Sequence, residues 1–250
     1  MKLTCRQQLH ADDNQILAGL LDMNVAVQPT QKAEVKKYDV FVFELCEGNI
    51  SKENINGSYG QTLGLSDSVS ICDQLLEGLI QLEKSKCCHN DLKPENVLFN
   101  YNGNFEIRIS DFGKADRSGG TPGWTWPKFL TERKPGKSDV YSVALLMLYT
   151  MCEDREVFYR IRNNYVQNCG QKWLTDFRND PFMMLVNDMM DLKVTPRETK
   201  NRWNQISGQV QVITKDYLRR NYGVDDRWLR VQDEMDVHQL KLASLSVLDR

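Results

Sequence analysis

The pattern of apolar and polar positions predicts strands early in this 250-residue chain and helices later. Residues 39–45 are rich in β-branched and aromatic side chains, which is typical of a strand. Residues 97–99 and 105–109 predict two more strands, and the Asn-Gly pair between them favours a tight hairpin turn. Residues 13–21 carry apolar side chains at helical spacing, and residues 25–27 predict a short strand.

Two longer apolar patterns predict buried helices. From residue 66 to residue 82, apolar side chains recur at helical spacing, and Ser66, Asp67 or Ser68 would cap that helix. Residues 140–151 are almost wholly apolar, which predicts a central helix too short to span a membrane. The remainder, including residues 228–248, has amphipathic helical spacing. The chain is therefore predicted to be an α+β protein dominated by helices.

Composition and charge narrow the class of protein. Hydrophobic residues make up 41% and charged residues 26%, as in ordinary globular proteins. The net charge of -2 argues against a nucleic-acid partner. No apolar run is long enough for a membrane span, and the N-terminus lacks a signal-peptide core, so we expect a cytoplasmic or nuclear protein that is not secreted. The seven cysteines form no Cys-x-x-Cys pair, so a structural zinc is not expected.

Candidate chemistry is concentrated in two short segments that flank the hairpin. Asp91 is a carboxylate that could take the proton of an attacking hydroxyl, and Lys93 is a cation that could reach the same space. Asn96 and Asp111 supply an amide and a carboxylate oxygen, the hard ligands that Mg²⁺ prefers. Gly113 gives the backbone freedom after Asp111. The set is suited to phosphoryl transfer from a magnesium nucleotide.

These segments resemble the motifs of the eukaryotic protein kinase family, serine/threonine type. Residues 89–96 read His-Asn-Asp-Leu-Lys-Pro-Glu-Asn, similar to the family's catalytic loop, and residues 111–113 read Asp-Phe-Gly, its metal-binding triplet. Residues 120–124 resemble the loop that receives the substrate, and residues 138–142 resemble the start of the central helix. The resemblance covers roughly residues 10–206 and implies a kinase-like fold.

The resemblance assigns roles to individual residues. Asp91 would be the catalytic base, Lys93 would contact the transferred phosphate of ATP, and Thr121 would orient both. Asn96 and Asp111 would hold Mg²⁺ beside the nucleotide. Glu44 and Cys46 would lie in the hinge whose backbone meets adenine, and the aspartate at position 139 would hold the catalytic loop. His89 is expected to have a structural role, bonding backbone near Asp111.

The resemblance also implies a division of the chain. Residues 1–45 would form a remnant of the N-terminal lobe, a helix plus two strands, together with the hinge. Residues 46–250 would form the helical C-terminal lobe. A glycine-rich phosphate loop is not found, and Gln28 stands where the ATP-anchoring lysine is expected. Asn90 replaces an arginine that usually pairs with a phosphorylated loop, and Trp126 begins a Trp-Pro-Lys segment where Ala-Pro-Glu is expected.

Two functions remain open on these residues. The first is a kinase that transfers the γ-phosphate of ATP to a serine or threonine of a protein substrate. The second is a catalytically impaired pseudokinase that binds and regulates a partner, such as another kinase. Its contact surface would be the nucleotide cleft, which a reduced N-terminal lobe leaves exposed.

Overall fold

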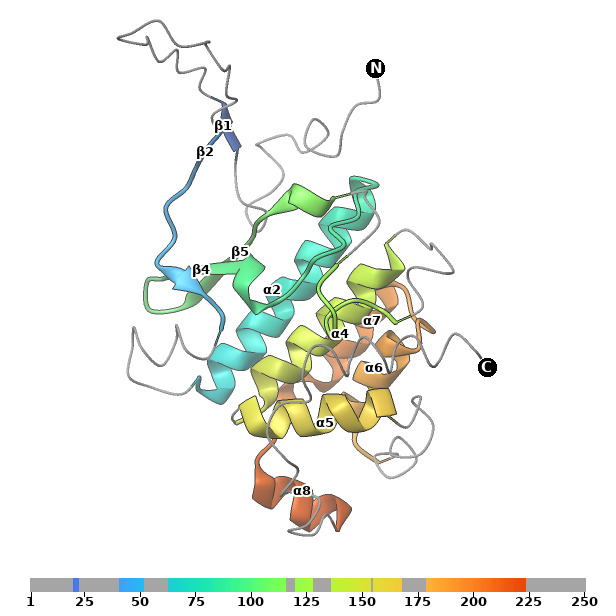
Figure 1. The fold of residues 1–250 in the computed structure, drawn as a ribbon. Coiled ribbons are helices and arrows are strands. Elements are labelled where there is room, and N and C mark those ends of the chain that lie inside the picture. Colours follow the sequence, from blue (N-terminus) through green and yellow to red (C-terminus); the bar gives the residue numbers. More distant parts are fainter. Residues whose placement is uncertain are drawn as a thin grey trace, which may run out of the picture.

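A computed structural model gives the fold of the chain (Figure 1). It describes residues 20–22, 41–51, 63–115, 120–127, 136–153, 155–167 and 179–223. Several predicted features lie outside these residues: the helix over 13–19, the strand over 25–27, the loop over 57–62, the segment at 116–119, Gln28, Lys128 and the amphipathic stretch at 228–248.

An antiparallel three-stranded sheet lies on one side of the helices. Strand β4 (Val97–Tyr101) pairs with β5 (Phe105–Ile109) along their full lengths, and the short β3 (Gly48–Asn49) pairs with the other edge of β4. The two predicted strands are confirmed. The turn between them spans three residues, 102–104, instead of the predicted two, and Gly103 takes a left-handed φ of 78° that glycine tolerates without strain.

A second, two-stranded sheet pairs β1 (Leu20–Asp22) with β2 (Phe41–Phe43), antiparallel. The predicted strand at 39–45 is confirmed at Phe41–Phe43, but the chain leaves strand geometry at Glu44. The helix predicted over 13–21 is wrong at its last two residues, which belong to β1. Pairing with β2, twenty residues further on, supplies hydrogen bonds that local spacing does not reveal.

The predicted helices are confirmed as α2 (Leu65–Lys84) and α4 (Lys137–Met151), and the chain after them is helical as expected. It forms α5 (Arg155–Gln167), α6 (Pro181–Met190), α7 (Pro196–Ile206) and α8 (Lys215–Tyr222). Helix α4 runs through the middle of the helical part, with α2 on one side and α5 and α6 on others (Figure 1). From Ser138 to Met151 every residue of α4 is buried, which explains its unbroken apolar sequence.

The predicted cap of α2 is wrong. The helix begins at Leu65, ahead of all three residues expected to cap it, so Gly64 is the N-cap and no side chain caps the helix. Ser68 instead lies in the first turn, where its hydroxyl donates to the carbonyl oxygen of Thr150 in α4 at 3.1 Å. Ser68 thus connects α2 to α4 instead of capping α2.

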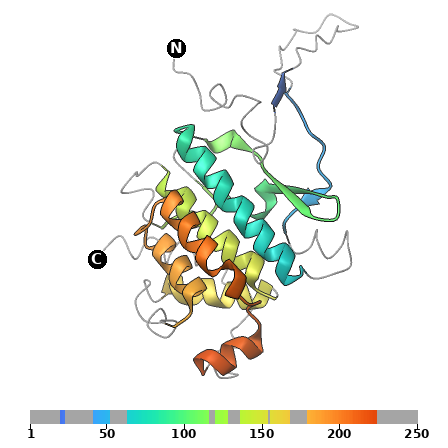
Figure 2. The same cartoon turned by 180° about the vertical axis from the view of Figure 1, so that it is seen from behind.

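Helix α7 packs against the back of α2, as Figure 2 shows. Lys200 of α7 bridges the carboxylates of Asp73 and Glu77 on α2, at 2.6 and 3.1 Å. Helix α8 stands apart below the other helices (Figure 1), with Leu218 as its one buried residue. None of the helices in the described ranges is long and apolar enough to cross a membrane. Sheets and helices together confirm the α+β class.

Candidate active site

A buried carboxylate from α4 fixes the segment that carries Asp91. Asp139 is 1% exposed and lies in the first turn of α4. Its two oxygens accept from the backbone N–H groups of His89 and Asn90, at 2.7 and 2.8 Å. Asn90 has a left-handed φ of 65°, a conformation held by this double contact. The role expected of the aspartate at position 139 matches this geometry.

His89 links the same segment to the end of β5. Its Nε2 lies 2.8 Å from the carbonyl oxygen of Ser110, and its Nδ1 lies 3.3 Å from the backbone nitrogen of Asp91. A carbonyl can only accept, so Nε2 carries the proton and Nδ1 accepts from Asp91. The ring also packs against Phe112, with centroids 4.7 Å apart. The structural role predicted for His89 is confirmed.

Both carboxylate oxygens of Asp91 are engaged. The hydroxyl of Thr121 donates to Oδ1 at 2.7 Å, and the ammonium of Lys114 lies 3.0 Å from Oδ2. The Asp91 side chain is 4% exposed. Burial on its own would raise the pKa of Asp91, but hydrogen bonds from Thr121 and Lys114 and the charge of Lys93 outweigh it and lower the pKa. Asp91 is therefore ionised at neutral pH, as the role predicted for it requires.

The oxygens expected to hold Mg²⁺ remain available. The 3₁₀ turn η2 (Pro94–Asn96) places Asn96 so that its Nδ2 donates to the carbonyl oxygen of Asp91 at 2.8 Å, which leaves its Oδ1 as an acceptor. Asp111 has a left-handed φ of 58° and caps η3 (Phe112–Lys114), accepting from Gly113 through Oδ1 at 3.2 Å. No cation pairs with Asp111 within the described residues. An amide and a free carboxylate oxygen fit a magnesium ion that takes its other ligands from phosphate and water.

The loop at residues 120–127 packs against helices α4 and α5 and against the segment that carries Asp91. A Cβ on Gly120 would lie 2.8 Å from the carbonyl oxygen of Asn90, so only glycine allows this close approach to the loop that carries Asp91. Trp124 stacks on Phe158 of α5, with centroids 5.3 Å apart, and its carbonyl accepts from Ser142 of α4 at 2.7 Å. These contacts fix Thr121 against Asp91.

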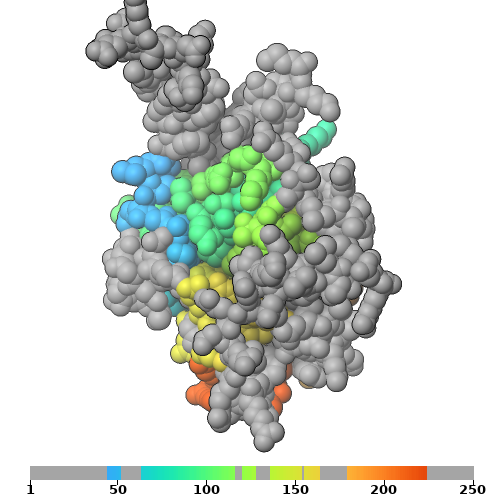
Figure 3. Space-filling model, viewed as in Figure 1, coloured from blue at the N-terminus to red at the C-terminus, as the bar shows by residue number. Residues whose placement is uncertain are grey.

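Glu44, one of the residues predicted to lie in the hinge, contacts the hairpin. The Glu44 carboxylate accepts from Asn100 at 2.9 Å and from Arg108 at 3.2 Å. Burial first, and the nearby charge of Glu44 second, raise the pKa of the Cys46 thiol. Leu45 between them is 93% exposed, which is unusual for so large an apolar side chain. Figure 3 shows residues 44–51 (blue) beside the green surface that includes the hairpin.

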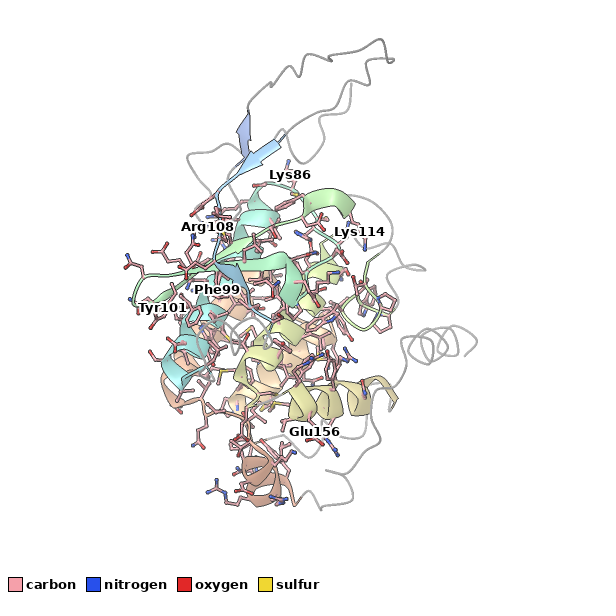
Figure 4. The ribbon with its side chains drawn as sticks, turned by 60° about the vertical axis from the view of Figure 1, so that its left-hand side comes forward. Lys86, Phe99, Tyr101, Arg108, Lys114 and Glu156 are labelled. Carbon is pink, nitrogen blue, oxygen red and sulfur yellow. The ribbon has the colours of Figure 1, made fainter. Side chains whose placement is uncertain are left out.

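Sequence reasoning missed Lys114. It lies at the end of η3, on the opposite side of the view from Tyr101 at the end of β4 (Figure 4), and reaches a carboxylate 23 positions earlier in the chain. Neither motif signals this contact, because the direction of η3 is set by the left-handed backbone at Asp111. The side chain of Lys93, in contrast, makes no ion pair or hydrogen bond with any residue that the structure describes, and Thr121 contacts Asp91 without bonding the Lys93 side chain there.

Comparisons with known proteins agree with this geometry. The model of the protein kinase domain matches residues 7–223. Calcium/calmodulin-dependent protein kinase type 1 of Caenorhabditis elegans is 33% identical over 141 residues, 52% of this chain and 39% of that protein. The kinase of the same name from Macrobrachium nipponense is 31% identical over 149 residues, 55% of this chain and 42% of that protein. Serine/threonine-protein kinase dst1 of Dictyostelium discoideum is 33% identical over 121 residues, 42% of this chain and 15% of that protein. The chain thus matches well under two thirds of each relative's length.

Proposed function

The chain belongs to the protein kinase family, and we propose that it is a protein serine/threonine kinase that uses ATP and Mg²⁺. One observation carries this proposal. Asp91 is a buried, ionised carboxylate, and the hydroxyl of Thr121 orients it by donating to its Oδ1 at 2.7 Å. A carboxylate held in this way is poised to accept a proton from a hydroxyl. Of the three relatives described above, two are named calcium/calmodulin-dependent protein kinases and one a serine/threonine-protein kinase, which supports the same activity.

In the proposed reaction, Asp91 accepts the proton of a serine or threonine hydroxyl while that oxygen bonds to the γ-phosphorus of ATP. The bond between the γ-phosphorus and its bridging oxygen breaks, and ADP leaves with the electron pair. Lys93, unpaired among the described residues, offers its charge to the transferred phosphoryl group. Thr121 and Asp139 act on Asp91, the first through its side chain and the second through the preceding backbone.

Asn96 and Asp111 would hold the magnesium ion of the nucleotide. Bound there, the metal would neutralise charge on the phosphates and align them. The protein's own contribution is to fix the two ligands. The Asn96 amide is oriented by its bond to the Asp91 carbonyl, and the Asp111 carboxylate is held by the bond that it accepts from the backbone of Gly113. Glu44 and Cys46 would present hinge backbone to adenine.

A second function has one specific observation in its favour. Leu45, next to the proposed adenine site, is almost fully exposed. An exposed apolar side chain in the hinge suits contact with another protein, such as a partner kinase, as well as it suits a nucleotide. In that case the chain would be a pseudokinase that binds through its cleft without transferring phosphate.

Nucleotide binding and phosphate transfer separate the two functions. Thermal melting is measured with and without Mg²⁺ and ATP, and transfer of labelled phosphate to dephosphorylated casein is measured in parallel. A kinase site filled to about a hundred times its dissociation constant gains about 2.7 kcal/mol of stability. Asp111→Ala should remove this gain. Asp91→Asn should keep it while lowering transfer by roughly a hundredfold or more.

Asp216→Asn is the matched control, because Asp216 is an exposed carboxylate of α8 that pairs with Arg219. Binding and transfer should both be unchanged in it. Wild-type protein that neither gains stability nor transfers phosphate would contradict the kinase proposal and leave the pseudokinase in its place. Transfer that persists in Asp91→Asn would exclude Asp91 as the base.

A further inference from the structure

We propose that Lys114 is a positioning residue that closes the base Asp91 to water and gives way to the hydroxyl of the protein acceptor. The inference rests on the proposed kinase function and assigns a role to a residue that the expected motifs do not include. Two lysines lie near Asp91, and they are placed differently. The Lys114 ammonium is 3.0 Å from Oδ2, whereas Lys93 acts on the same carboxylate through its charge without a direct contact in the described residues.

The two oxygens of Asp91 are not equivalent. Oδ1 accepts from Thr121, which belongs to a loop anchored by the Trp124 ring on α5, so this contact is part of the rigid framework. Oδ2 accepts from Lys114, whose side chain is 46% exposed and extends from a single 3₁₀ turn. The incoming hydroxyl must reach an oxygen of Asp91, and Oδ2 is the one with a movable partner. Displacing the Lys114 ammonium therefore opens the base without disturbing Thr121.

The contact between Lys114 and Asp91 would limit hydrolysis of ATP by water, a reaction that competes with phosphoryl transfer. Water can donate to Asp91 just as an alcohol can, and its oxygen can attack the γ-phosphorus to give ADP and inorganic phosphate. A lysine that occupies Oδ2 until a bulkier acceptor docks denies water that position. Once displaced, the ammonium stays near the phosphoryl group, because it is tethered three residues after Asp111, the proposed magnesium ligand. It can then stabilise the same developing negative charge as Lys93.

The first test compares ATP hydrolysis without acceptor with phosphate transfer to dephosphorylated casein. Lys114→Met keeps the length of the side chain and removes its charge, so the ratio of hydrolysis to transfer should rise by roughly tenfold. The apparent KM for casein should not rise, because no displacement is needed. Lys114→Arg should keep the wild-type ratio. Lys84→Ala, an exposed lysine at the end of α2, is the control and should change neither rate.

The second test needs no turnover. Trace labelling with acetic anhydride, read by mass spectrometry, reports how strongly each lysine amine is held. Lys114 should react several-fold more slowly than Lys84 in the wild-type protein. The protection should be lost in Asp91→Asn, and it should fall when casein and Mg²⁺ with a non-hydrolysable ATP analogue are added.

The outcomes distinguish failure of the inference from failure of the proposed function. An unchanged ratio of hydrolysis to transfer in Lys114→Met overturns the role of Lys114 and leaves the kinase function intact. A wild-type protein that transfers no phosphate overturns the function. The labelling then decides the inference, because equal reactivity of Lys114 and Lys84, or protection that casein does not relieve, contradicts it.

Discussion

Asp139 shows how one buried residue can set the geometry of a whole site. Its carboxylate has no place in the proposed chemistry, yet it accepts from the backbone of His89 and Asn90 and so determines where Asp91 begins. Bonds from backbone N–H groups to a charged acceptor contribute more than neutral ones, and their loss leaves buried donors unsatisfied. The stability of the fold and the position of the base therefore depend on the same side chain.

Asp139→Asn is predicted to destabilise the protein by about 3 kcal/mol. The asparagine amide keeps one acceptor oxygen, which can serve only one of the two backbone N–H groups. Its NH₂ group replaces the second oxygen and cannot accept, so the other backbone N–H loses its partner. Urea denaturation followed by tryptophan fluorescence would measure the change in free energy of unfolding. Asp73→Asn is the control, because Asp73 pairs with Lys200 on a half-exposed surface and should lose less than about 1 kcal/mol. Equal losses in the two variants would contradict the special role of Asp139.

At the scale of elements, the sequence predicted a helix correctly where its buried residues form a pattern that can be recognised in the local sequence. Helix α2 buries one face and α4 buries nearly all of its residues, and both patterns are visible in the chain. Strand β1 was predicted as helix because Leu20 and Leu21 follow two apolar residues at helical spacing, and its partner β2 is remote in sequence. The cap of α2 failed because Ser68 bonds to α4 instead of to its own helix.

The contrast between local pattern and remote contact also separates the site residues that were predicted from Lys114, which was missed. Asp91, Asn96 and Asp111 belong to motifs of fixed spacing, and Thr121 was implied by the family resemblance. Lys114 required knowledge of the left-handed turn at Asp111, which sets the direction in which η3 carries its side chains. Contacts that depend on backbone conformation between two motifs cannot be inferred from either motif alone.

The loop at residues 120–127 is predicted to depend on one of its two tryptophans much more than on the other. Trp124 is 7% exposed, stacks on Phe158 and meets Tyr149 edge-on at 5.8 Å. Trp124→Ala should cost about 3–5 kcal/mol, as for other large aromatic side chains removed from a core. Trp126 is only partly buried, so Trp126→Ala should cost clearly less. Thermal melting of both variants tests this, and equal losses would show that the two rings anchor the loop together.

The whole molecule is built around α4, and its stability should decrease from that helix outward. Helix α8 buries only Leu218, and its two tyrosines, Tyr217 and Tyr222, donate to one carboxylate, Asp180, at the start of α6. Burial, followed by the hydrogen bond with Asp180, raises the pKa of Tyr217 to about 12, so its hydroxyl keeps its proton and remains a donor at neutral pH. Attachment of α8 therefore rests on this small polar cluster together with the one buried side chain of Leu218, which belongs to the hydrophobic core.

Hydrogen exchange read by mass spectrometry should resolve this gradient. Amides of α4 are predicted to exchange only through global unfolding, whereas those of α8 should open locally and faster. Tyr222→Phe removes a 2.7 Å hydrogen bond and should speed exchange in α8 by roughly fivefold, equivalent to about 1 kcal/mol, without changing α4. Tyr101→Phe, at the hairpin end of the sheet, is the control and should leave α8 unchanged. If Tyr222→Phe accelerated exchange in α4 as well, α8 would belong to the same cooperative unit as the central helix, and the polar cluster at Asp180 would be part of the global fold.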